Sequence, residues 1–493
     1  MRKDIVLLTA GRAAQALLAM AGLRLLTALL SPAQVGSVFL ILSFGSWFGL
    51  FLISPVGNFI NRRLHGWHAA GTLGARLRLF NFYVLAVALL ALPLVFTCKV
   101  FLGVGAQLPL PHFMAVVALY VYAVTWNQTA VPALNMLGRR GAFVGFSVLS
   151  AALGLLCSVL LSFYVGRTAA SWMYGQVAGF FIGYLAARAA LKSDAGSGRE
   201  VFAPLNRGGL DTLWAFAAPL SLSALLMWVQ TQSYRVIVER FVGPEFLGYL
   251  VVGLGIAASL AGVTESIVQQ LYFPGFYKKL HGASRQQRAE AISGLAAKAI
   301  PAYVVISVFV FALSGHLTRL LADESFRAAW KFAAAGAVIE LFRMTANIYA
   351  AAAHAEMKTA ELVRPYAWGG ALTAGAVLAV CLSGLPPALI PAGMAAGGLV
   401  ALAIMKRSMQ GLLPFKGGRA PALKGLLFSA VFLPALLVPR QENLWLTLGL
   451  LAVFGVYFLY AQWRLLGPGP EGAPGASPED RAAAEAGSFR GEA

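Results

Sequence analysis

The sequence predicts an all-α polytopic membrane protein with about 14 transmembrane helices, and three observations lead to this prediction. Hydrophobic residues make up 59% of the 493 residues and charged residues only 12%, which is not the composition of a soluble globular chain. Apolar runs of about 18 residues or more recur along the sequence, and each can cross a hydrocarbon core about 30 Å thick. A segment from Arg24 to Gly66 also recurs from Arg235 to Gly282, which indicates two related halves.

The repeated segment contains an arginine, a Pro/Gly turn, a second apolar run and a basic end. Its matched positions are Arg24, Pro32, Gly36 and the basic end 62–66 in the first copy, and Arg235, Pro244, Gly248 and the basic end 278–282 in the second. The interval between the copies is far longer than the period of a solenoid. We therefore expect two pseudo-symmetric six-helix lobes around a central cavity, followed by two extra C-terminal helices.

The spans must be helices, because the hydrocarbon core offers no hydrogen-bond partner to an open strand edge. The first run is too long for a signal peptide and carries two arginines, so we interpret it as an uncleaved first span. The predicted spans are 5–30, 35–60, 79–97, 112–137, 142–165, 169–190, 210–238, 247–271, 296–314, 329–353, 362–383, 386–405, 422–439 and 444–463.

Composition also predicts the boundaries between these parts. A Gly/Ser- and charge-rich stretch suits a cytoplasmic linker between the lobes. The final stretch of Gly, Pro, Ala, Glu and Ser cannot bury a core and should be disordered. The expected parts are an N-terminal lobe 1–191, a linker 192–209, a C-terminal lobe 210–405, the two extra helices within 406–466 and a cytoplasmic tail 467–493.

The net charge of +19 would suggest a nucleic-acid partner in a soluble protein, but in a membrane protein basic loops mark the cytoplasmic side. With the amino terminus inside, most of the 38 Lys and Arg residues fall in cytoplasmic segments, above all 61–78 and 278–298. We therefore expect both termini in the cytoplasm, membrane lipids as partners and no nucleic acid. The three cysteines show no spacing typical of a disulfide framework or a metal site, and no cofactor or metal is expected.

Four arginines lie inside predicted spans: Arg12, Arg24, Arg235 and Arg343. An arginine near the bilayer centre costs roughly 2.5–3.5 kcal/mol on insertion scales, so it usually faces a cavity or a partner. Arg343 shares a helical face with Glu340, and Arg235 has Glu239 one turn later, so internal pairing is an open alternative at both positions. Arg24 has no acidic residue within a turn, which favours a cavity-facing role.

Other polar residues recur at matching depths in the two halves, as a cavity between two lobes would require. In the repeat, Arg343 is at the position equivalent to Asn127, which is followed by Gln128. Gln270 is likewise at the position equivalent to Asn58. These side chains are therefore candidates for lining the cavity.

Acidic residues inside the spans suggest a second kind of site. Glu265 has no cation within reach along the sequence, so it is a candidate for proton or sodium coupling, together with Glu340. The alternative is that Glu265 pairs with Arg12 across the lobes. Arg12 itself lies near the inner end of its span, where a long side chain can also extend to the headgroups.

Arginine in a dry cavity favours a multiply charged anion, because its planar fork binds phosphate through two parallel hydrogen bonds. We therefore expect a pyrophosphate headgroup as the ligand and no catalytic residue. The candidate substrate-binding residues are Arg24, Arg343, Arg235, Arg12, Asn127, Gln128, Asn58 and Gln270, and the ion-coupling candidates are Glu265 and Glu340.

Three features together resemble a known family: the arginine in the first span, the sequence L-S-P-x-x-x-G that begins the second, and G-N-F-I-N-R-R (Gly57 to Arg63) at its end. They are similar to the polysaccharide-transporter branch of the multidrug/oligosaccharidyl-lipid/polysaccharide (MOP) exporter superfamily, over spans 1 to 12. The resemblance implies a flippase in the bacterial inner membrane that moves undecaprenyl-pyrophosphate-linked oligosaccharides outward by alternating access. It also implies cationic residues in the cavity, glycan polymerase or assembly proteins as partners, and a proton gradient, a sodium gradient or the membrane potential as the driving force.

Other functions remain open at this point. A lipid II flippase of the same superfamily suits 14 spans, and a cation-coupled multidrug antiporter would use the intramembrane carboxylates. A polytopic glycan enzyme would need a D-x-D metal site or a large external loop, and the sequence has neither. A non-transporting scaffold of a glycan assembly complex is a further alternative.

Overall fold

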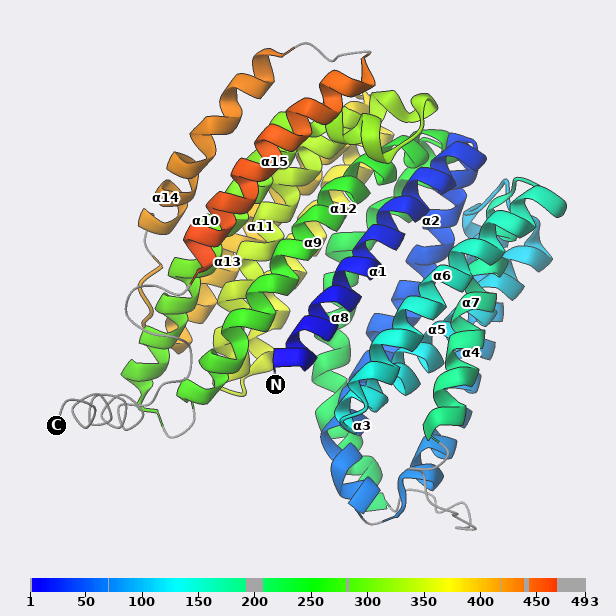
Figure 1. Cartoon of the computed structure of the whole chain (residues 1–493). Helices are drawn as coiled ribbons and strands as arrows, with labels where there is room; N and C mark the ends of the chain where they lie inside the picture. The colour runs from blue at the N-terminus through cyan, green and yellow to red at the C-terminus, as the bar shows by residue number, and fades with distance from the viewer. Residues whose placement is uncertain are drawn as a thin grey trace.

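The computed structural model describes residues 2–69, 71–191, 207–280, 283–417, 419–438 and 443–467. All regular structure in these ranges is helical (Figure 1). The first half contains α1 (Arg2–Leu29), α2 (Pro32–Trp47), the π-helix η1 (Phe48–Ile53), α3 (Ser54–Ala69), α4 (Leu73–Leu102), α5 (Leu110–Met136), α6 (Arg140–Tyr164) and α7 (Ala169–Leu191). The second contains α8 (Arg207–Phe241), α9 (Pro244–Leu280), α10 (Arg285–Leu321), η2 (Glu324–Ala329), α11 (Trp330–Ala355), η3 (Thr359–Leu362), α12 (Val363–Leu382), η4 (Pro387–Leu389), α13 (Ile390–Leu412), α14 (Ala420–Ser429), η5 (Ala430–Leu437) and α15 (Leu444–Leu466).

The predicted fold class is confirmed, and each of the 14 predicted spans coincides with a helix or with a continuous run of helical segments. The second span is α2–η1–α3 and the thirteenth is α14–η5. In the described ranges, 12 helical segments are long and apolar enough to cross a membrane. The other two spans are α7, with 23 residues, and α11, with 26 residues. They are also long enough to cross, but α11 is less apolar because it carries Glu340 and Arg343.

The helices form two groups that correspond to the two halves of the sequence (Figure 1). In the first group α6 and α5 pack on α7, α4 packs on α5, and α1 packs on α6. In the second group α9, α10 and α11 pack on one another, and α12 packs on α8 and α13. The two C-terminal helices α14 and α15 both lie against α10, so they cover the second group.

The two halves meet most extensively where α2 crosses α9, and the repeated Pro/Gly pairs form this crossing. A Cβ atom on Gly36 would overlap the carbonyl oxygen of Pro244, and a Cβ on Gly248 would overlap the carbonyl oxygen of Pro32. Because these glycines have no side chain, the first turn of α9 packs directly on Gly36 and the first turn of α2 packs directly on Gly248. The crossing lies on the side that the charge distribution predicts to be external, called the outer side below.

The second span contains a wide turn at its midpoint. In η1 the N–H of Ser54 bonds to the carbonyl of Gly49, five residues back, which is the spacing of a π-helix. Pro55 follows directly and has no N–H to donate. The Tyr83 hydroxyl of α4 donates to the Leu52 carbonyl at 2.7 Å. The corresponding helix of the second half, α9, is an α-helix of 37 residues without such a turn.

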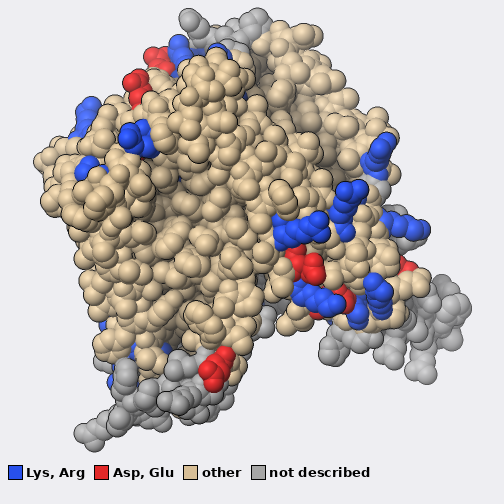
Figure 2. Space-filling model, turned by 180° about the vertical axis from the view of Figure 1, so that it is seen from behind, with Lys and Arg blue, Asp and Glu red and all other residues tan. Residues whose placement is uncertain are grey.

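The distribution of charge fits a membrane protein. Figure 2 shows a broad belt without charged side chains between two ends at which Lys, Arg, Asp and Glu gather. One ion pair at the side predicted to be cytoplasmic joins Arg288 of α10 to Glu356, just after α11, at 2.6 Å. The predicted linker and tail lie outside the described residues apart from 207–209 and Gly467, and the limits of the lobes stay predictions.

Candidate functional site

A cluster of four polar side chains lies inside the second half, between α9 and α11. Arg343 Nε donates to Glu340 Oε2 at 2.7 Å, and its Nη2 donates to Glu265 Oε2 at 2.8 Å. The Asn347 amide donates to the other oxygen of Glu265 at 2.9 Å. The two carboxylates are 12–13% exposed and the guanidinium 32%. Glu265 therefore finds its cation on α11, and the predicted alternative of pairing with Arg12 is wrong.

The balance of charge in this cluster determines what it can bind. Two carboxylates face one guanidinium, so with both carboxylates ionised the cluster carries one net negative charge. In a low-dielectric environment such a charge favours a proton or a monovalent cation. The described residues contain no group of three or more His, Cys, Asp or Glu that could hold a metal ion.

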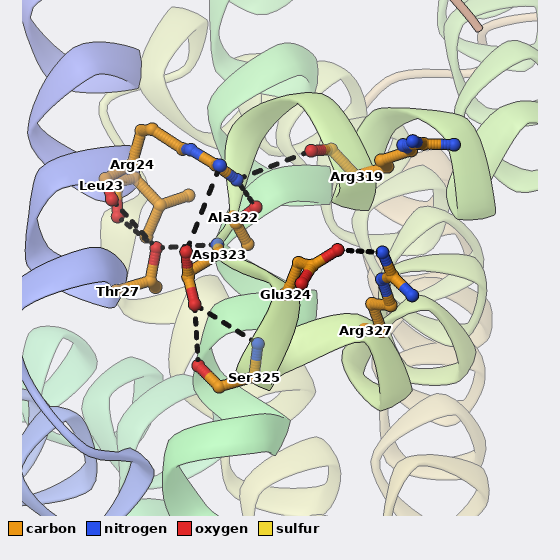
Figure 3. Close-up of polar contacts among 9 residues, drawn as sticks. All are labelled: Leu23, Arg24, Thr27, Arg319, Ala322, Asp323, Glu324, Ser325 and Arg327. Carbon is orange, nitrogen blue, oxygen red and sulfur yellow. Dashed lines mark hydrogen bonds and ion pairs between the residues drawn. The ribbon is translucent and has the colours of Figure 1, made fainter. Parts of the chain in front are cut away.

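Arg24 lies at the outer side and reaches the opposite half of the molecule (Figure 3). Its Nη1 donates to the carbonyl of Ala322, at the end of α10, and more weakly to the carbonyl of Arg319 at 3.4 Å. Its Nη2 is 3.9 Å from a carboxylate oxygen of Asp323. Thr27, one turn later on α1, accepts a hydrogen bond from the Asp323 N–H at 3.0 Å. Arg24 thus has an acidic neighbour that is distant in the sequence.

Around these contacts lies a small pocket of about 230 Å³. It is lined by Arg24, Arg319, Ala322, Asp323, Glu324, Arg327 and Leu444. Arg327 pairs with Glu324 within η2 (Figure 3). Partial burial raises the pKa of Asp323, but hydrogen bonds from Ser325 and the charge of Arg24 outweigh it and leave the pKa below its ordinary value. Asp323 is therefore ionised at neutral pH.

Arg235, the counterpart of Arg24 in the repeat, also reaches the opposite half, but through an aromatic ring. Its guanidinium lies 5.2 Å from the ring centroid of Phe39 on α2, and its Nε donates to the hydroxyl of Tyr234 at 3.2 Å. The alternative that Glu239 neutralises Arg235 is wrong. Both oxygens of Glu239 accept from the N–H of Gly105, at 3.0 and 2.9 Å, in the loop between α4 and α5.

The remaining predicted site residues do not gather around one point. Asn127 is buried in the first half, where its amide donates to Ser150 Oγ at 2.8 Å and to the Phe180 carbonyl. The other four are exposed: Arg12, Asn58, Gln128 and Gln270. Of these, Arg12 donates to Gln15 on its own helix and Gln270 to Ser266 on its own helix. Their predicted role in binding substrate stays a prediction.

The contacts that Thr27, Glu239 and Asp323 make between the halves were not predicted from the sequence. Thr27 and Asp323 give no signal in isolation, because a threonine in an apolar span and an aspartate in a loop are both ordinary. For Glu239 a signal existed. It lies five residues before Pro244, as Thr27 lies five residues before Pro32, so aligning the repeats on the prolines pairs the two positions.

Comparison with known proteins gives a likeness in fold. No protein-family model matches the chain, and no curated protein matches it in sequence. The lipid II flippase MurJ, in an inward closed conformation, aligns with a TM-score of 0.67 at 11% identity, covering 94% of this chain and 98% of that chain. An inward-facing multidrug resistance MATE family transporter of the MOP superfamily aligns with a TM-score of 0.59 at 13% identity, covering 87% of this chain and 98% of that chain.

At these identities the likeness establishes the fold, which is that of MOP-superfamily membrane transporters such as MATE and MurJ. The fold expected from the resemblance is therefore confirmed, whereas membership of the polysaccharide-transporter branch stays a prediction.

Proposed function

We propose that this chain is a flippase that moves an undecaprenyl-pyrophosphate-linked oligosaccharide from the cytoplasmic to the outer leaflet of a bacterial inner membrane. In this proposal the lobes 1–191 and 210–405 alternate between cytoplasm-open and outside-open arrangements. Both termini lie in the cytoplasm, and an ion gradient or the membrane potential drives the cycle.

The observation that carries the proposal is the extent of the likeness to a lipid flippase. The comparison with MurJ covers 94% of the chain, whereas that with the MATE transporter covers 87%. The chain also has two helices beyond the twelve of the two lobes, α14 and α15, and they present many large apolar side chains outward. A lipid-linked substrate suits a transporter that matches a lipid flippase over nearly its whole length.

The intramembrane arginines support a pyrophosphate headgroup. Arg24 is 44% exposed on its side chain, so it can exchange a backbone carbonyl and Asp323 for a phosphate, which a guanidinium binds through two parallel hydrogen bonds. Arg343 would have to leave Glu265 or Glu340 to do so. That exchange would free a carboxylate to take a proton or a sodium ion, which gives the acidic cluster a role in coupling.

A cation-coupled multidrug antiporter is the second candidate, and the net negative charge of the Glu265, Glu340 and Arg343 cluster favours it. A cationic solute would be attracted to this cluster and repelled by a cavity dominated by arginine. The two functions therefore make opposite demands on the same side chains.

The deciding experiment uses purified protein in vesicles with two probes. One is a fluorescent polyprenyl-pyrophosphate sugar, whose exposure on each leaflet is measured with an impermeant quencher, and the other is a fluorescent organic cation. Flipping of the first without transport of the second supports the proposal; the reverse result establishes the antiporter. In cells, deletion of the gene should leave lipid-linked oligosaccharide on the cytoplasmic leaflet.

A further inference from the structure

Two contacts at the outer side join each half to a loop of the other half. In the first, the hydroxyl of Thr27 on α1 accepts from the N–H of Asp323, in the loop between α10 and η2, at 3.0 Å. Arg24 strengthens this contact by donating to the carbonyl of Ala322 in the same loop (Figure 3). α1 belongs to the first half, and the loop that it holds belongs to the second.

In the second contact the halves exchange roles. Glu239 on α8 is 5% exposed, and both carboxylate oxygens accept from the N–H of Gly105 in the loop between α4 and α5. Lys99 donates to the carbonyl of Gly105 at 2.6 Å and fixes the loop from the other side. Gly105 has φ of 73°, and a Cβ there would lie 2.7 Å from Phe113, so this loop conformation requires glycine.

The two contacts are equivalent under the repeat of the sequence. Thr27 and Glu239 each lie five residues before the proline that begins the next helix, Pro32 or Pro244. Each uses a side-chain oxygen to accept a backbone N–H from the loop between the third and fourth spans of the opposite half. The two contacts therefore join equivalent positions of the two halves, and both lie across the same outer side of the interface.

We propose that Thr27 and Glu239 are paired clasp residues that hold the outer side of the interface between the halves closed, and that both contacts must break before the transporter opens outward. The Glu239 clasp is the stronger, because a buried carboxylate makes a charge-assisted hydrogen bond. The charged groups around it are Lys99 and Arg240, whose guanidinium lies beside Gly103. The proposal is independent of which substrate is carried.

The test is accessibility from outside of a cysteine at position 43. Ser43 of α2 is fully buried, and its hydroxyl donates to the Gln232 carbonyl of α8 at 3.3 Å, so it lies in the seam that opening would expose. The variant Ser43→Cys is made in a background in which Cys98, Cys157 and Cys381 are replaced by alanine. Its rate of reaction with an impermeant thiol reagent is then measured in right-side-out vesicles.

Glu239→Gln should raise this rate about tenfold, because a charge-assisted hydrogen bond is replaced by a weaker neutral one. Thr27→Val, which keeps the shape and removes the acceptor, should raise it about threefold. The separate variant Thr27→Ser keeps the hydroxyl acceptor, so its rate should equal that of the protein with Thr27. Glu245→Gln alters an exposed carboxylate at the start of α9 and should leave the rate unchanged.

A second reporter separates opening from general loosening. Ser314, on α10, is buried within the second half, so a cysteine there should stay unreactive in every variant. An unchanged rate at position 43 in both Glu239→Gln and Thr27→Val would overturn the proposal. So would a parallel rise at positions 43 and 314, because that would show loss of packing instead of separation of the halves.

Discussion

The two copies of the repeated segment agree in their packing residues and differ in their polar ones. Pro32 and Gly36 in the first copy make the same crossing as Pro244 and Gly248 in the second. The arginines, in contrast, reach across the interface to different groups. Arg24 contacts backbone carbonyls and Asp323, whereas Arg235 faces Phe39.

The fourth spans of the two halves differ in the same way. In the first half Asn127 joins α5 to α6 and α7 through neutral hydrogen bonds. In the second half Arg343 joins α11 to α9 through ion pairs with Glu265 and Glu340. The comparison indicates that the two fourth spans share a backbone arrangement, while among the described residues only that of the second half carries ion pairs.

A large effect on stability should follow from disrupting the helix crossing that the two copies share. Gly36→Ala and Gly248→Ala each place a methyl group on a backbone carbonyl oxygen, which cannot be relieved by a rotamer change. Both should lower stability by at least the roughly 1–3 kcal/mol typical of overpacking. Gly255→Ala is the matched control on α9, where a Cβ meets nothing within 4 Å. Thermal unfolding in detergent measures all three. A clear difference in stability between Gly36→Ala and Gly248→Ala would show that the two sides of the crossing are not equivalent.

A large effect on stability should also distinguish the fourth spans of the two halves. Arg343→Ala leaves two carboxylates without their cation, and removal of one member of a buried ion pair costs about 3–5 kcal/mol. Asn127→Ala removes neutral hydrogen bonds and should cost about 1–3 kcal/mol.

Adding Glu265→Gln to Arg343→Ala is the critical control for this pair of variants. Neutralising one carboxylate should recover part of the lost stability, measured by the same thermal unfolding. If the double variant is no more stable than Arg343→Ala, the net negative charge is not what makes the cluster sensitive.

The two repeat arginines should differ in their response to lysine. Arg24→Lys loses the planar fork that binds carbonyls and phosphates, so export per folded molecule should fall partly, and Arg24→Ala should lower it severely. Arg235→Lys keeps a cation near Phe39, and cation–π contacts are worth about 0.5–2 kcal/mol, so only a minor loss is expected. Full export in both Arg24→Ala and Arg24→Glu would exclude an anion site at Arg24.

The contact between Arg24 and Asp323 also predicts a pH dependence. Because the folded-state pKa of Asp323 lies below its ordinary value, its contribution to stability is present above the ordinary pKa and is lost as the pH falls through the lowered one. The loss of stability in Arg24→Ala should therefore be the same at pH values of about 5 and 7. If the loss of stability in Arg24→Ala disappears already at the lower of these two pH values, Asp323 is not the titrating partner of Arg24.

The smallest effect is expected at Arg12. This side chain is exposed and bonds to Gln15 on its own helix, so Arg12→Gln should change stability by less than about 0.5 kcal/mol. A large loss of export at normal stability would instead favour the predicted role of Arg12 in substrate binding.

The helices and the repeat could be predicted from the sequence because hydrophobic length and Pro/Gly punctuation act locally along the chain. The pairing of Arg343 with Glu340 was likewise accessible, since the two share one helical face. Partners distant in sequence were not accessible. Neither Arg343 with Glu265 nor Arg24 with Asp323 follows from periodicity, because each depends on how separate helices are positioned by tertiary packing.

The wide turn in the second span has a consequence for how the two halves can tolerate length changes. A helix turns by about 100° per residue, so one inserted or deleted residue would normally rotate every later side chain onto the wrong face. The π-helical hydrogen bond in η1 spans one residue more than an α-helical one. Deleting one residue there can therefore convert the turn to α-helical spacing and keep the later side chains on their faces. The helix α9 contains no π turn and cannot absorb a deletion in this way. Single-residue deletion scanning should therefore find a tolerant stretch at 48–53 and none at the midpoint of α9.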